Sequence, residues 1–83
     1  MLCEIERMGA RQLRDKVEAA CGAAEVSGPA WCAAALGSAR SELGFLICNF
    51  ETVKEIDARR ILTRARDVLA DWHDRRARRT RIA

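Results

Sequence analysis

The sequence of 83 residues contains no tyrosine, one proline and only four aromatic residues, two tryptophans and two phenylalanines. Its β-branched residues are few and never alternate with polar residues over the length of a strand, which argues against a sheet. Alanine and arginine dominate instead, and both favour helices. We therefore predict an all-α fold in a single domain over residues 1–83, near the lower size limit for a self-sufficient core.

The sequence also lacks the usual signatures of chemistry. His73 is the only histidine, and no C-x-x-C pair or zinc-ligand spacing occurs among the four cysteines. Gly37 and Gly44 fall inside an expected helix rather than after a strand, so no phosphate loop is present. We predict no catalytic residue, no cofactor and no metal site, and hence no enzyme. A small helical enzyme that uses converging arginines is a third alternative, but no spacing supports it.

No segment approaches the roughly 20 apolar residues that a membrane-spanning helix needs. The opening residues, MLCEIERM, carry charges inside their apolar run and do not resemble a signal peptide. These patterns predict a cytoplasmic protein with reduced thiols and no membrane contact. The alanine- and arginine-rich composition indicates a GC-rich coding sequence, which suggests a bacterial or phage origin.

Apolar residues recur at helical spacing in three segments. The first predicted helix, over residues 10–24, has an apolar face at Ala10, Leu13, Val17, Ala20, Cys21 and Ala24. The second, over residues 30–48, has a core face at Cys32, Leu36, Ala39, Leu43 and Ile47, and Phe50 continues this face just after the helix. The third, over residues 58–78, has a stripe at Ile61, Leu62, Ala65, Val68, Leu69 and Trp72. This pattern predicts a small three-helix bundle.

The expected ends of these helices depend on local signals. Gly9 is the predicted start or kink of the first helix, which leaves residues 1–9 as a short turn or a loose arm. Pro29 suits the first turn of the second helix, and Asn49 is expected to end it in a left-handed conformation. Asp57 is the favoured N-cap of the third helix, over a competing capping box that begins at Thr52.

The second and third stripes stay in phase if the helix is never broken. One continuous helix of some fifty residues, paired with the first helix as a long hairpin, is therefore an alternative that would require a dimer partner. In either arrangement we expect a homodimer, because the second predicted helix has more than one face to cover. A line of small residues runs along this helix: Ala33, Gly37, Ser41, Gly44 and Cys48. Such a line favours close approach of another backbone. The alternative is that the small residues reflect only an alanine-rich sequence.

Two aromatic residues lie opposite the core face of the second predicted helix. Trp31 and Phe45 share that side with Ser38, Glu42 and Asn49, all of them polar. Large aromatics among polar residues are typical of interface anchors. These five residues form the predicted protein interface, with the alternative that the first helix or the N-terminal arm covers the two aromatics within one chain.

Positive charge is concentrated at the end of the sequence. The chain has 15 basic and 12 acidic residues, a net charge of +3. The predicted basic tail, residues 75–83, contains five arginines: Arg75, Arg76, Arg78, Arg79 and Arg81. The rest of the chain is therefore mildly acidic. Such a tail could contact phosphates, although arginines near a helix C-terminus also complement its dipole.

These patterns predict a protein that acts by contact. The first hypothesis is a small helical module that binds another protein, as an adaptor, regulator or inhibitor that occupies a partner surface. The alternative is a nucleic-acid-binding regulator that uses the arginine tail.

Overall fold

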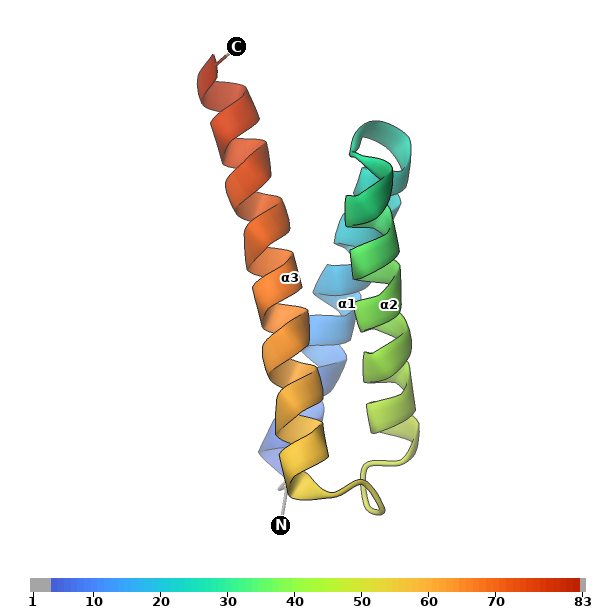
Figure 1. The fold of residues 1–83 in the computed structure, drawn as a ribbon. Helices are drawn as coiled ribbons and strands as arrows, with labels where there is room; N and C mark the ends of the chain where they lie inside the picture. Colours follow the sequence, from blue (N-terminus) through green and yellow to red (C-terminus); the bar gives the residue numbers. More distant parts are fainter. Residues whose placement is uncertain (1–3, 83) are drawn as a thin grey trace.

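The computed structural model describes the backbone of residues 4–82 and the side chains of residues 4–78. Three α-helices, and no strand, make up this part of the chain: α1 (Glu4–Ser27), α2 (Ala30–Cys48) and α3 (Glu55–Ile82). Helices α1 and α2 form an antiparallel hairpin, and α3 returns along both in an elongated body of 46 × 19 × 17 Å (Figure 1). The predicted three-helix arrangement is confirmed. A single helix through α2 and α3 is excluded, because residues 49–54 form a turn.

The core is made almost entirely by the predicted apolar stripes. All six predicted residues of α1 are buried, as are all six predicted for the second stripe. Leu46 was not assigned to the core, yet it is fully buried between the helices. In α3, Ile61 and Val68 are only partly buried at the edge of the core. None of the buried residues in the described chain is polar or charged, so the core between the helices is formed by apolar packing.

Helix α1 does not begin after Gly9, as the sequence suggested, but continues through it to the beginning of the described chain. Two contacts explain the extra turns. The Arg7 guanidinium lies 5.5 Å from the centre of the Phe50 ring, and the Glu6 carboxylate pairs with Arg59 on α3 at 3.5 Å. These contacts outweigh the intrinsic cost of a helical glycine, which is about 1 kcal/mol relative to alanine. The predicted loose arm is therefore helical where it is described, and residues 1–3 lie outside the described chain.

Asn49 ends α2, but not in the left-handed conformation that we expected. Its φ and ψ are −120° and 26°. Its backbone N–H donates to the carbonyl oxygens of Phe45 and Leu46, and its side-chain amide donates to the Phe45 carbonyl at 2.9 Å. The Asn49 side chain thus provides a hydrogen bond to a carbonyl oxygen at the end of α2. In the expected left-handed cap, backbone N–H groups would have bonded such carbonyl oxygens. Phe50 follows and is buried against the core.

Helix α3 begins at Glu55, between the starts that the two predicted caps imply. Asp57 lies within the first turn of the helix rather than before it, and the neighbouring Ile56 is 67% exposed. The hydroxyl of Thr52 donates to the Asn49 carbonyl at 3.1 Å, so this residue stabilises the turn instead of capping α3. Both cap predictions are wrong, because hydrogen bonds within the turn bring the chain into helical conformation by Glu55.

The connection between α1 and α2 presses closely on α3. The Gly28 N–H donates to the Ala24 carbonyl at 2.9 Å. A Cβ atom at Gly28 would lie 2.8 Å from Cζ3 of Trp72 and 3.0 Å from the Ala24 Cα. The missing side chain therefore permits the contact by which Trp72 of α3 packs under the α1–α2 turn.

We predict that Gly28→Ala lowers the free energy of unfolding by about 1–3 kcal/mol, the usual cost of overpacking a core. The matched control is Gly22→Ala, within the C-terminal part of α1, where an added Cβ meets no atom within 4 Å. That change should stabilise the helix by roughly 0.5–1 kcal/mol. Urea denaturation followed by circular dichroism measures both. Equal stability of the two variants would contradict the tight turn.

Candidate functional site

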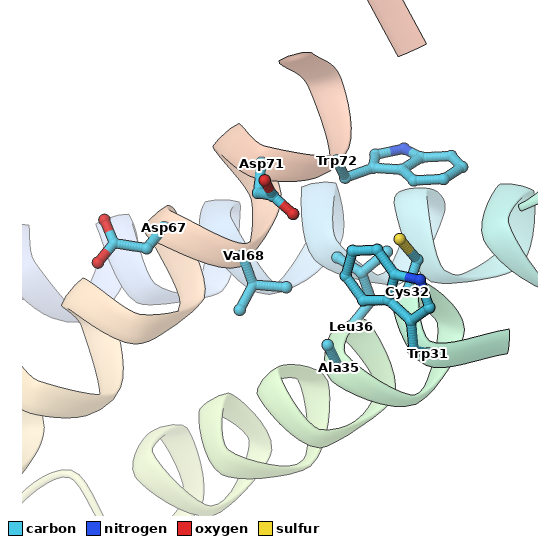
Figure 2. Close-up of a pocket in the computed structure, with 8 residues that line it drawn as sticks. All are labelled: Trp31, Cys32, Ala35, Leu36, Asp67, Val68, Asp71 and Trp72. Carbon is cyan, nitrogen blue, oxygen red and sulfur yellow. The ribbon is translucent and has the colours of Figure 1, made fainter. Parts of the chain in front are cut away.

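An apolar cavity of about 230 Å³ lies between α2 and α3. Figure 2 shows the side chains that line it, four from each helix: Trp31, Cys32, Ala35 and Leu36 from α2, and Asp67, Val68, Asp71 and Trp72 from α3. Only the two aspartates are charged. The cavity is thus a hydrophobic site with carboxylates on one wall.

The two tryptophans have different environments. Trp72 is only 3% exposed and its indole N–H finds no acceptor among the described residues, so packing rather than hydrogen bonding fixes this ring. Trp31 is 51% exposed, and the Arg75 guanidinium lies 4.4 Å from its ring centre. Arg75 also donates from Nε to Asp71 at 2.9 Å, and this hydrogen bond raises the pKa of the arginine. Arg75 is therefore a fixed cation that crosses from α3 to the exposed tryptophan.

A second hollow, of about 300 Å³, adjoins the first. It shares Cys32 and Trp72 with the apolar cavity, and its other walls are largely basic: Pro29, Arg75, Arg76 and Arg78. The Arg76 guanidinium lies 5.7 Å from the Trp72 ring centre, while Arg78 pairs with Asp74 one turn earlier. We call the apolar cavity and this basic hollow together the α2–α3 groove.

The predicted interface residues do not gather on one surface. Trp31 belongs to the α2–α3 groove, and Glu42 faces α3, where its carboxylate accepts from Arg64 Nη1 at 3.1 Å. Asn49 caps α2. Ser38 is exposed, and Phe45 is 58% exposed. The structure thus divides the set between the seam with α3 and the exposed side of α2.

The exposed side of α2 away from α3 is nearly free of charge. Six of its exposed residues are small or apolar, and we call them the α2 outer face: Ala30, Ala34, Ser38, Ser41, Phe45 and Cys48. Arg40 is also exposed, but it does not belong to this strip, and its charge acts on the Cys21 thiol of α1. Among residues 30–48, Phe45 is therefore the one large side chain on an otherwise flat, neutral strip.

The predicted line of small residues permits close packing only near its beginning. The Sγ atom of Cys21, on α1, lies 3.7 Å from the Ala33 carbonyl oxygen, and it lies 3.8 Å from a Cβ built at Gly37. Burial is the main cause of the raised pKa of the Cys21 thiol, so this cysteine acts as a small hydrophobe. At Gly44, an added Cβ would meet nothing within 4 Å.

The predicted basic tail is part of a helix. Helix α3 continues to Ile82, past the expected end at Arg78, and its last turns extend beyond the α1–α2 connection (Figure 1). Arg75, Arg76 and Arg78 line the basic hollow. The backbone at Arg79 and Arg81 is helical, whereas their side chains lie outside the described part of the structure.

Within the described chain, no three histidine, cysteine or acidic residues are grouped so that they could hold a metal ion. His73 is exposed on α3, and Cys21 and Cys32 are buried while Cys48 is exposed. None of the three described helices is long and apolar enough to cross a membrane.

Comparisons with protein-family models, with curated proteins and with solved structures find no match for this chain. The groove itself was not predicted from the sequence. Val68 and Trp72 were assigned to the core stripe, and Asp67 had no assigned role. The available signal was the position of Trp31, which neighbours α3 once the antiparallel packing of α2 and α3 is known.

We predict that truncation after Asp74 lowers stability by about 1–2 kcal/mol, because it removes the two arginines that stack on Trp31 and Trp72. Truncation after Ala77 keeps both arginines and should change the melting temperature much less. Thermal denaturation followed by circular dichroism compares the two shortened chains with the full chain. If both truncations destabilise equally, residues beyond Ala77 contribute to the fold and the stacking contacts do not explain the loss.

Proposed function

We propose that this protein acts by binding another protein, as an adaptor, regulator or inhibitor that occupies a partner surface, without catalysis or a cofactor. The observation that carries the proposal is Phe45, more than half exposed on the neutral α2 outer face. One third of the chain is charged, so a charge-free strip of this length stands apart from the rest of the surface.

Protein interfaces combine the same two features. The buried centre of an interface is depleted in charged residues and enriched in aromatic residues. A few central aromatic anchors also supply most of the binding free energy. Phe45 is well placed for this role, because the small residues beside it let a partner reach the full face of its ring.

We further propose that the protein forms a homodimer through the α2 outer face. A second copy carries the same net positive charge, but this face brings no like charges together. If two α2 helices pack antiparallel, the Phe45 ring can lie over a small residue of the other helix. The core available to a monomer of 83 residues is also near the minimum for independent stability.

Nucleic-acid binding through the arginines of α3 is the second candidate function. It is favoured by the extension of the α3 backbone beyond the α1–α2 connection (Figure 1) and by the exposure of Arg75, Arg76 and Arg78 on that helix. Two of these arginines already pair with carboxylates, Arg75 with Asp71 and Arg78 with Asp74, which reduces the charge available to phosphates. Binding of this kind should weaken steeply with salt.

The test of the first proposal is Phe45→Ala. We expect unchanged helical content and weakened association, since loss of an interface aromatic costs about 2 kcal/mol or more in binding, or roughly 30-fold in affinity. Circular dichroism measures the fold. Light scattering and covalent cross-linking over a range of concentrations measure the dimer, and affinity capture before and after nuclease treatment measures other partners.

The matched control is Val26→Ala, which removes apolar surface from α1 at a residue that is 89% exposed. It should leave association unchanged. Unfolding of the Phe45 variant would make this ring part of the core. Unchanged association by both variants would refute the α2 outer face as a binding surface, and nuclease-sensitive capture would favour the second candidate.

A further inference from the structure

The α2–α3 groove joins an apolar cavity to a basic hollow through Cys32 and Trp72, which line both. We propose that this groove binds an acidic amphipathic segment of a partner protein, with one apolar side chain in the cavity and carboxylates against the arginines. The inference rests on the proposed protein-binding function, and it specifies the partner chemistry and a second surface, distinct from the α2 outer face.

The cavity has the size of one large side chain. A protein cavity of about 150 Å³ can hold benzene, and this one measures about 230 Å³. Its walls include Trp31, Leu36 and Val68, so a leucine or an aromatic ring would replace water against apolar surface. An apolar anchor surrounded by a polar rim is the usual arrangement when a groove binds an amphipathic helix.

The charge of the groove specifies the rest of the segment. Arg75 and Arg76 are held over the rings of Trp31 and Trp72, and Arg78 lines the same hollow. Arg75 and Arg78 also pair with Asp71 and Asp74, so a carboxylate of the segment is bound by their remaining N–H groups. Guanidinium groups match carboxylates in shape and bind them with paired hydrogen bonds. Because stacking already restricts two of these side chains, less conformational entropy is lost when they bind.

The opposite end of the groove limits where the acidic residues can lie. Asp67 lines the apolar cavity and makes no ion pair with any side chain between residues 4 and 78. It would repel a carboxylate placed over the cavity. The favoured segment therefore carries its acidic residues at the arginine end. A nucleic acid fits less well, because its uniform phosphates would also face Asp67 and would leave the cavity unfilled.

The experiment uses the full chain and a synthetic amphipathic helical peptide with leucines on one face and glutamates elsewhere, labelled for fluorescence anisotropy. Three probes serve as comparisons: the same peptide with lysine for glutamate, a glutamate-rich peptide without leucine, and a DNA duplex. We expect measurable binding of the acidic amphipathic peptide and at least about tenfold weaker binding of each comparison probe. Tryptophan fluorescence should change on binding, since both tryptophans line the groove.

Two variants of the protein locate the binding site. Arg76→Glu with Arg78→Glu reverses two charges in the basic hollow and should weaken peptide binding by about tenfold. Arg11→Glu with Lys16→Glu makes the same change in net charge on the exposed surface of α1 and should weaken it less than about threefold. Ala35→Leu, which fills the cavity, should also reduce binding. Circular dichroism checks that each variant is folded.

Several results would overturn the groove proposal. These are equal binding of the lysine peptide or of DNA, equal loss in the two charge-reversal variants, and no effect of Ala35→Leu in a folded protein. Loss of self-association in the Arg76 and Arg78 variant, without peptide binding by the unmodified protein, would assign the groove to a second copy instead. Absence of peptide binding together with a clear Phe45→Ala effect would reject the groove while leaving the α2 outer face in place.

Discussion

The packing of Trp72 beneath the α1–α2 turn is the contact on which the arrangement of the helices depends. The indole fills the space that a side chain at Gly28 would occupy, and it is almost completely buried there. This contact anchors the later half of α3 to the hairpin, near the end of the predicted core stripe. In a bundle with no buried polar or charged residue between residues 4 and 78, such steric fit is the main source of a unique arrangement.

The same contact determines where the candidate groove lies. Beyond Trp72, α3 continues past the hairpin (Figure 1), and the next arginines have the two tryptophan rings as neighbours rather than a third helix. Before Trp72, Val68 lies at the edge of the core and leaves the apolar cavity open beside Trp31 (Figure 2). The apolar cavity therefore lies on one side of the buried Trp72 side chain and the basic hollow on the other, so that the two adjoin.

The surface combines regions of opposite character. Helix α3 is lined with ion pairs between residues one turn apart and with α2, such as Arg64 with Glu42. Exposed pairs of this kind contribute little to stability, but they balance charge along the helix. The α2 outer face has no such pairs, and among the residues one turn from Phe45 on α2 only Glu42 is charged. This separation of neutral and charged surface is the physical basis for the two proposed binding sites.

The sequence by itself determined the all-α fold and nearly all of the core, because helical periodicity depends only on the order of apolar and polar residues. It left open whether the second and third helices are continuous, which the turn at residues 49–54 decided. It also placed Phe45 opposite the core face of α2, whereas the structure decided that no other described helix covers it. It did not determine the helix ends, since contacts such as Arg7 with Phe50 and the side-chain cap of Asn49 join residues through the folded chain. Only the tertiary structure decided that Trp31, Val68 and Trp72 share a cavity, because the alignment of two packed helices depends on side-chain shape across their interface.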